Sequence, residues 1–484
     1  MRPTNLLLIM SDEHNRSVLG AAGHPMVRTP NLDRFAANGT RFTDAYCNSP
    51  ICVPSRASFA TGQFVHDVRR WDNATPYDGS IPSWHHRLRA AGHRVTSIGK
   101  LHFRSSDDDN GFSEELIPLH VPYNIGDPLS LIRDNPPARI ETLKLGQEAG
   151  RGESTYQKYD DQITAKAESW LRARASEASE RPWVLFVSLV CPHFPLIARP
   201  QWYDLYPEAD VPLPPLYTAQ ERPHHPFIDA MRKVYTYDEG FDEASVRRAI
   251  TAYFGLVSFL DDNVGCLLRT LEETGLGAST RVIYTSDHGD NLGARGLWGK
   301  STLYEPSAGV PLIMGGPDIS AGYVCREPVT LVDGYPTILD CVGLARTKNE
   351  DKLPGTSWFD TLRGQKPKTS ALCEYHTTGA TTAAYMLRKV RFKYMHYVGM
   401  PPQLFDLDVD PGEVYDFGTD PGYASLVAEC ERELRTIVDP DAVDRVARAD
   451  QALQIAHFGG REAILAKGAY SYSPAPGTEA VYSV

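Results

Sequence analysis

The stretch Asn5-Leu-Leu-Leu-Ile-Met-Ser-Asp12 is an apolar run that ends in a hydroxyl and a carboxylate. A short continuous apolar run is typical of a strand that is buried on both faces of a parallel sheet. Similar runs, each followed at once by polar residues, occur at 94–98, 183–190 and 281–285. Helical patterns occur between them at 31–38, 84–91, 161–174 and 252–273. This alternation predicts an α/β fold, with a mostly parallel sheet covered by helices on both faces.

Residues that can carry chemistry follow the ends of these four runs. They are Asp12 and Glu13 after the first, Lys100 and His102 after the second, His193 after the third, and Asp287 and His288 after the fourth. Open α/β sheets bind ligands beyond the carboxyl ends of their strands, so we expect these side chains to meet in one crevice. Position alone also allows structural roles, because Asp12 could cap a helix and Asp287-His288 could form a turn.

The character of the sequence changes after about residue 364. Short alternating segments at 371–375, 383–389, 392–397 and 403–405, then helical patterns near 423–438 and 442–455, predict a small antiparallel sheet with helices. We therefore expect a catalytic domain at 1–365, a small α+β subdomain at 366–457 and an extended tail at 458–484. The tail is rich in Gly, Tyr and Pro and is expected to dock on something, with a neighbouring subunit as one candidate.

Four further expectations come from the rest of the sequence and its composition. The Pro-rich segment 200–245 is expected to form a long loop or lid at the pocket mouth. The chain has 484 residues and a net charge of −12, which argues against a nucleic acid or an anionic membrane as partner. The apolar run at 6–10 is too short for a signal peptide or a membrane span, so a cytoplasmic location is expected. The eight Cys show no C-x-x-C spacing, which disfavours a disulfide framework or a structural zinc site.

The segment Cys52-Val-Pro-Ser-Arg56, with Thr61-Gly62 downstream, resembles the signature of the type I sulfatases. In that family a formylglycine-generating enzyme oxidises the Cys to formylglycine, whose hydrated gem-diol is the nucleophile. The resemblance thus implies that Cys52 is a precursor and not a thiolate catalyst. Its place at a predicted helix start also suits an anion, because backbone N–H groups and the helix dipole favour negative charge there.

Further stretches match the same family in order. They are Thr29-Pro-Asn-Leu-Asp33, Gly99-Lys-Leu-His102, Pro192-His-Phe-Pro195, Ser286-Asp-His-Gly289, Trp298-Gly-Lys300, and Leu404-Phe-Asp-Leu407 with Asp410-Pro-Gly-Glu413. The resemblance covers about residues 4–420. It implies an alkaline phosphatase-like sandwich, with a large mostly parallel sheet flanked by helices and a smaller C-terminal α+β subdomain.

The resemblance also implies a role for each matched residue. The implied metal ligands are Asp12, Glu13, Cys52, Asp287 and His288. Oxygen ligands with one imidazole suit Ca²⁺ or Mn²⁺, and Mg²⁺ is possible. The implied catalytic residues are Cys52, Arg56, Lys100, His102, His193 and Lys300, in which the lysines clamp sulfate oxygens and the histidines transfer protons. Asn73 would bind the sulfate or the leaving oxygen.

Two departures from the family pattern keep the subgroup open. Glu13 stands where the family usually has Asp or Gln, and Asp287-His288 stands where arylsulfatases commonly have Asp-Asn. The second variant also resembles the choline sulfatases and the phosphonate monoester hydrolases.

Three functions are consistent with these residues. The leading hypothesis is hydrolysis of a small-molecule sulfate monoester, in which the alcohol is choline, an aryl group or a sugar. The alternative is a phosphonate monoester hydrolase or phosphodiesterase that uses the same site, because the chemistry of either tetrahedral oxyanion needs the same groups. A non-catalytic binder of sulfated ligands is the third. The aromatic tail makes a homo-oligomer, a dimer or a tetramer, an expectation as well.

Overall fold

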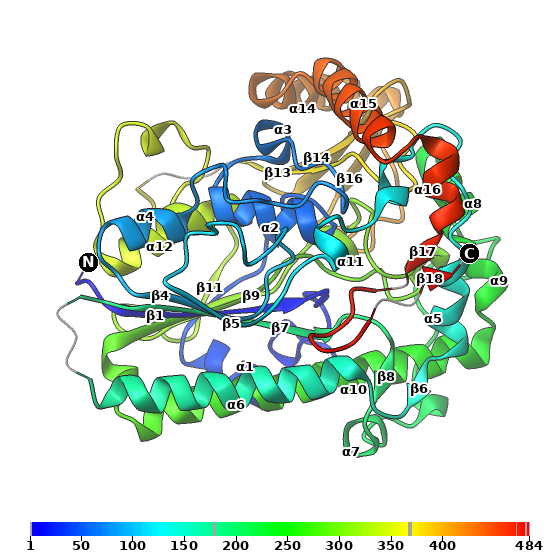
Figure 1. Ribbon diagram of the computed structural model, residues 1–484. Coiled ribbons are helices and arrows are strands. Elements are labelled where there is room, and N and C mark those ends of the chain that lie inside the picture. The colour runs from blue at the N-terminus through cyan, green and yellow to red at the C-terminus, as the bar shows by residue number, and fades with distance from the viewer. Residues whose placement is uncertain (1, 178–180, 366–369, 471, 480–481, 484) are drawn as a thin grey trace.

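The computed structural model describes residues 2–177, 181–365, 370–470, 472–479 and 482–483. A large sheet with the strand order β11-β2-β10-β9-β1-β7-β4-β5 forms its centre (Figure 1). Its strands are β1 (Asn5–Asp12), β2 (Thr40–Phe42), β4 (Val95–Lys100), β5 (Glu114–Leu119), β7 (Val184–Pro192), β9 (Thr280–Ser286), β10 (Leu312–Gly315) and β11 (Tyr323–Cys325). Only β10 pairs antiparallel within this sheet, with β9 and β2. The mostly parallel sheet that the sequence predicts is confirmed.

The four strands predicted from apolar runs are neighbours at the centre of this sheet, as β9, β1, β7 and β4. The run from Leu6 to Met10 in β1 has no exposed side chain. Each buried aliphatic side chain contributes roughly 2 kcal/mol relative to exposure, which explains why this run occupies the middle of the sheet. All four strands end at the same edge, which brings their following residues together.

Helices cover both faces of the sheet. Figure 1 shows α1 (Pro30–Ala37), α6 (Thr155–Ala175) and α10 (Glu243–Glu273) on one side, and α2 (Cys52–Thr61), α4 (Trp84–Ala90) and α12 (Gly334–Val342) on the other. The helices α6 and α10 begin six and nine residues before the predicted starts at 161 and 252. Capping boxes explain both, because Ser154 pairs with Gln157 and Asp242 pairs with Ser245 at the true N-termini.

A separate antiparallel sheet follows, as predicted. It consists of β13 (Ser370–Tyr375), β14 (Ala384–Lys389), β15 (Phe392–Tyr397) and β16 (Gln403–Asp406), in sequential order. The helices α14 (Ala424–Ile437) and α15 (Pro440–His457) follow it, and Leu372, Tyr385 and Leu434 share a hydrophobic cluster. The predicted domain boundary after residue 365 adjoins residues 366–369, which lie outside the described ones.

Two segments that were expected to be irregular contain helices. The segment 200–245 contains α8 (Pro226–Tyr235) and α9 (Tyr237–Gly240), because Pro226 occupies the first turn and His225 accepts from the N–H of Phe227. The tail contains α16 (Arg461–Lys467) before the short strand β17 (Ala469–Tyr470).

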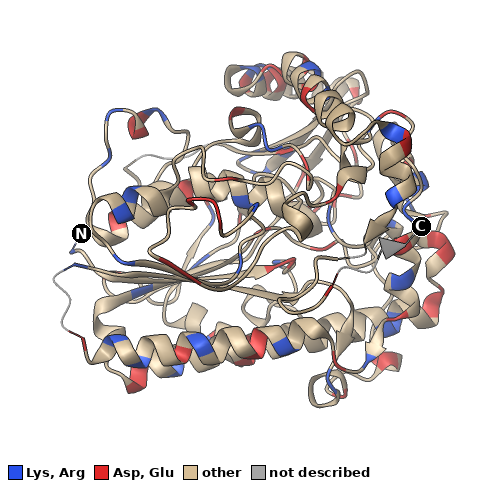
Figure 2. Cartoon of the chain, viewed as in Figure 1, with Lys and Arg blue, Asp and Glu red and all other residues tan. Residues whose placement is uncertain are grey.

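Lys and Arg are interspersed with Asp and Glu along α6 and α10 (Figure 2). Among the described helices, none combines the length and apolarity needed to cross a membrane.

A buried ion-pair cluster links the small sheet to the helical layer. Glu374 in β13 has no exposed surface, and its carboxylate lies 3.0 Å from Nδ1 of His66 in α3 (Val65–Val68) and 2.9 Å from Nε2 of His376. Burial opposes its ionisation, but the two histidines hold the pKa of Glu374 far below its usual range. Burial likewise opposes the charging of His66, but Glu374 raises the pKa of His66 above 6.5.

We expect Glu374→Gln to lower the free energy of unfolding by about 3 kcal/mol near pH 6, because it leaves a largely buried His66 without its charged partner. The ion pair of protonated His66 with Glu374 contributes its full stabilisation to the folded state below pH 6.5, the ordinary pKa of histidine. This contribution is lost as the pH rises through the raised pKa of His66. The difference in free energy of unfolding between wild type and variant, measured by urea denaturation, should therefore decrease from pH 6 to pH 9. A difference that does not change with pH would contradict the ion pair.

Candidate active site

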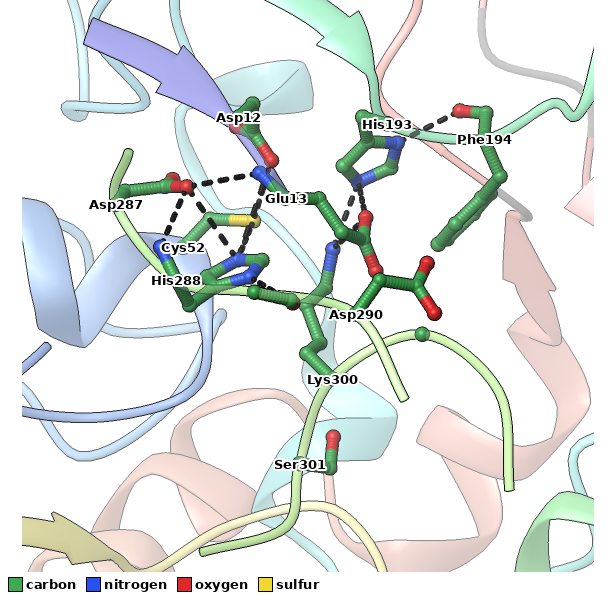
Figure 3. A network of polar contacts seen from close by, with 12 residues as sticks. Asp12, Glu13, Cys52, His193, Phe194, Asp287, His288, Asp290, Lys300 and Ser301 are labelled. Carbon is green, nitrogen blue, oxygen red and sulfur yellow. Dashed lines mark hydrogen bonds and ion pairs between the residues drawn. The ribbon is translucent and has the colours of Figure 1, made fainter. Parts of the chain in front are cut away.

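The predicted site residues converge at the carboxyl edge of the sheet. Asp12 ends β1, Lys100 ends β4, His193 follows β7, and Asp287 and His288 follow β9. Cys52 is the first residue of α2, whose N-terminus points at this edge, and Lys300 comes from the loop after β9. Figure 3 shows most of these side chains around a common centre. The crevice expected from the strand ends is observed.

Arg56 bridges the two aspartates from the second turn of α2. Its Nε lies 2.8 Å from Oδ2 of Asp287 and its Nη2 lies 3.0 Å from Oδ2 of Asp12. The Nζ of Lys100 lies 2.6 Å from the same Asp12 oxygen, and all four side chains are buried. Although burial opposes it, Lys100, His193 and Arg56 hold the pKa of Asp12 well below its usual range. Both cations therefore bind the outer Oδ2 atoms and leave the Oδ1 atoms to the centre of the site.

The inner atoms form a set of donors suited to a divalent cation. Ligand atoms of Asp12, Cys52, Asp287 and His288 all lie within 4.8 Å of one another. In the neutral ring, Nδ1 of His288 donates to the carbonyl of Gly289 at 3.0 Å and the lone pair of Nε2 faces the site. That Nε2 faces Oδ1 of Asp287 at 3.7 Å and Oδ1 of Asp12 at 3.9 Å. Oδ1 of Asp287 also accepts from the N–H groups of Glu13 and His288, at 3.2 and 3.0 Å. Two carboxylate oxygens and an imidazole nitrogen that face one another fit a metal ion.

Glu13 stands beside this group. Its backbone has a φ of 68°, and its Oε2 lies 3.1 Å from Nζ of Lys300 and 3.3 Å from Nε2 of His193. Its Oε1 is buried without a hydrogen-bond partner among the described residues. Burial, opposed by Lys300, raises the pKa of Glu13 to about 8. Glu13 forms a second possible ligand group with Asp12 and His193, so its role as a ligand stays a prediction.

His193 and Lys300 form a polar pair at the wall of the site. Nδ1 of His193 donates to the carbonyl of Phe194 at 2.6 Å, so its Nε2 accepts from Nζ of Lys300 at 2.7 Å. Burial and the charges of Lys300 and Lys100 hold the pKa of His193 well below its usual range. Burial opposes the charge on Lys300, but Cys52, Glu13 and Asp12 raise the pKa of Lys300. The pair therefore consists of an ammonium and a neutral imidazole.

Cys52 is 1% exposed and lies at the start of a helix. Its Sγ is 3.2 Å from Nε2 of His288 and 3.8 Å from Oδ1 of Asp12. Burial, and next the charge of Asp12, raise the pKa of Cys52 to about 11. The unmodified thiol is thus protonated near neutral pH and is a poor nucleophile.

A cavity of about 150 Å³ opens over Cys52. Of the predicted residues, Asn73, His102, His193 and Lys300 line it with Cys52, whereas Lys100 lies behind Asp12 and does not. Asn73 accepts from the N–H of Val53 at 3.2 Å through Oδ1, which leaves its amide N–H groups as donors. The walls include residues that the sequence analysis did not identify, namely Arg139, Glu141, Tyr235, Tyr237, Tyr470, Tyr472 and Ser473. Two features of the sequence point toward some of them. The Pro-rich segment 200–245, expected at the pocket mouth, contains Tyr235 and Tyr237, and the aromatic-rich tail contains Tyr470 and Tyr472.

Comparisons with known proteins agree with this architecture. The family model described as Sulfatase matches residues 4–344, and the one described as N-sulphoglucosamine sulphohydrolase, C-terminal, matches residues 293–439. The chain therefore belongs to the sulfatase family and is a hydrolase that acts on sulfate esters.

Individual relatives cover nearly the whole chain. A choline-sulfatase of Rhizobium meliloti (strain 1021) is 34% identical over 464 residues, which are 93% of this chain and 89% of the relative. Arylsulfatase K of Danio rerio is 28% identical, over 91% of this chain and 85% of the relative. Among solved structures, a phosphonate monoester hydrolase from Silicibacter pomeroyi superimposes with a TM-score of 0.71 at 24% identity, over 90% of this chain and 94% of that one. This last likeness supports the fold.

Proposed function

We propose that this chain hydrolyses a small-molecule sulfate monoester, with formylglycine made from Cys52 as nucleophile and one bound divalent metal ion. The observation that carries the proposal is the place of Cys52. It begins α2 at the base of the cavity, within hydrogen-bond range of a His288 nitrogen and close to Asp12. Its raised pKa speaks against a thiolate mechanism, whereas a hydrated aldehyde would supply a hydroxyl nucleophile at this position.

The metal site in this proposal consists of Asp12, Asp287 and His288, with the matured side chain of Cys52 beside them and Glu13 as a further predicted ligand. The expected ion is Ca²⁺ or Mn²⁺, with Mg²⁺ possible. Such an ion, when bound, polarises sulfate oxygens and favours deprotonation of the nucleophile. Arg56 holds both aspartates by their outer oxygens and keeps their inner oxygens in place.

The remaining residues bind the ester and move protons. Lys300 reaches the cavity as an ammonium and is suited to clamp a sulfate oxygen, while Lys100 acts through the Asp12 carboxylate that it contacts. Asn73 offers its amide N–H groups to the sulfate or the leaving oxygen. His102 and His193 both line the cavity and are the candidates to protonate the leaving alcohol and to deprotonate the nucleophile.

The proposal extends to the biology of the chain. It includes a formylglycine-generating enzyme as maturation partner, a cytoplasmic location, a homo-oligomer (dimer or tetramer), and domains at 1–365, 366–457 and 458–484. Light scattering on the purified protein measures the oligomeric state directly.

A matched set of nitrophenyl esters tests the reaction class. With matured protein we expect kcat/KM for the sulfate monoester to exceed that for the phosphonate monoester and the phosphodiester by about 10-fold or more, which is ~1.4 kcal/mol of transition-state binding. The same protein, assayed with choline, aryl and sugar sulfates, identifies the alcohol. A preference for the phosphodiester by orders of magnitude would replace the proposal with the alternative.

A further inference from the structure

The end of the chain returns to the active site. After α16, β17 pairs with β18 (Tyr482–Ser483), and the red trace in Figure 1 runs back toward the edge of the central sheet. Ile464 and Ala469 anchor this path, because both are buried in a cluster with Leu129 and Ile132. The tail thus docks on its own chain in this structure, and its position is fixed by apolar packing before it reaches the cavity.

Three contacts join the tail to the predicted catalytic histidines. Oγ of Ser473 lies 2.8 Å from Nε2 of His102, a residue 371 positions earlier in the chain. The backbone carbonyl of Ser473 accepts a hydrogen bond from the hydroxyl of Tyr156. The ring of Tyr156 packs edge-on against His193, with 5.8 Å between centroids, and against Tyr472, with 5.2 Å between centroids. One short segment therefore contacts His102 directly and His193 through Tyr156.

The contact with Ser473 determines which atom of His102 is available. Both side chains are only 6% exposed, and His102 has a φ of 55°. Within the part of the chain that the structure describes, Nδ1 of His102 is buried without a hydrogen-bond partner. Because Ser473 occupies Nε2, it fixes the ring orientation and leaves Nδ1 for another group, and its hydroxyl can accept from Nε2 or donate to it as the ring gains or loses a proton. A buried polar atom without a partner is costly, so its partner is expected to be supplied on binding.

We propose that Ser473 is a positioning residue that holds His102 ready for proton transfer, and that Tyr470, Tyr472 and Ser473 of the tail complete the substrate cavity from within the same chain. This inference rests on the proposed function, because it assigns Ser473 a role in that reaction. Ser473 acts through His102 and needs no contact with the ester.

Steady-state kinetics on matured Ser473→Ala protein test the role. We expect kcat to fall by about 10-fold or more, because loss of a supporting hydrogen bond lets a catalytic group leave its productive geometry, while KM changes by less than about 2-fold. Ser473→Thr keeps the hydroxyl and should retain kcat to within about 3-fold. Thr478→Ala removes an exposed tail hydroxyl that, among the described residues, bonds the carbonyl of Ala475 alone, and should behave as wild type.

A second measurement does not depend on turnover. In protein labelled with ¹⁵N-histidine, the ring signals of His102, assigned by their loss in His102→Gln, should be the same in wild type and Thr478→Ala and should shift in Ser473→Ala, because the Nε2 signal senses the loss of its hydrogen-bond partner. Signals and kcat that are identical in Ser473→Ala and Thr478→Ala would overturn the proposal, as would a change in KM alone. If matured wild type hydrolyses no sulfate ester but the His102 signals still shift in Ser473→Ala, the proposed function is wrong, whereas the hydrogen bond between Ser473 and His102 is confirmed.

Discussion

Cys52→Ala protein, made together with the formylglycine-generating enzyme, is expected to lose about 10⁴-fold or more of kcat/KM toward a sulfate ester relative to matured wild type, the size of effect seen when a covalent nucleophile is removed. The reason is structural, because Cys52 is the only residue of the motif that can become an aldehyde at the base of the cavity. Peptide mass spectrometry across Cys52, on protein made with and without a formylglycine-generating enzyme, should show aldehyde in place of thiol only with the enzyme. Activity should follow the modified fraction.

Cys47→Ala is the matched control for this experiment. Cys47 is also fully buried, its Sγ lies 3.9 Å from that of Cys373, and it belongs to neither ligand group. Its loss should leave kcat within about 3-fold of wild type, since it removes only a small buried side chain. The proposal is untenable if Cys52 stays a thiol with the maturation enzyme present and Cys52→Ala remains as active as wild type.

Asp287→Asn is expected to abolish metal binding and to lower kcat by about 10³-fold. The substitution removes the negative charge of one of the two carboxylates that face the site, and an amide cannot offer an oxygen both to the ion and to Arg56. Wild type freed of metal by a chelator should gain thermal stability when Ca²⁺, Mn²⁺ or Mg²⁺ is added. A cation at 100 times its Kd would add about 2.7 kcal/mol. The variant should show no such gain.

The control for the metal experiment is Asp160→Asn. Asp160 is a buried carboxylate near the end of β7 that accepts from the N–H groups of Val190 and Cys191 and lies outside both ligand groups. It should retain the cation-dependent rise in melting temperature. A rise that persists in Asp287→Asn, or is absent from wild type, would refute the assigned site.

The sequence predicts the part of the site that depends on regular strands. Apolar runs identify β1, β4, β7 and β9, and parallel topology then requires Asp12, His193 and Asp287 to meet at one edge. These positions follow from local pattern because each residue comes within two positions of a strand end. The small antiparallel sheet is also predictable from local pattern, because each of its strands is a short segment of alternating polar and apolar residues.

The remaining wall of the cavity is not predictable from local pattern. Tyr235 and Tyr237 lie at the junction of α8 and α9, in a segment whose prolines suggest a loop although Pro226 begins a helix. Ser473 meets His102 across 371 positions, and no periodicity encodes such a contact. The depth of Lys100 behind Asp12 is likewise a matter of tertiary packing, because its spacing from His102 is compatible with either position.

The near-complete burial of Cys52 requires that its side chain be modified before the chain has folded. A side chain that is 1% exposed, at the first turn of a helix packed over the central sheet, offers no access to a second protein. Any enzyme that alters its sulfur must therefore act on the nascent or unfolded chain, before β9 delivers Asp287 and His288 more than 230 residues later. The time between synthesis and folding, and not the affinity of a modifying enzyme for the folded protein, would then determine what fraction of molecules is modified at Cys52.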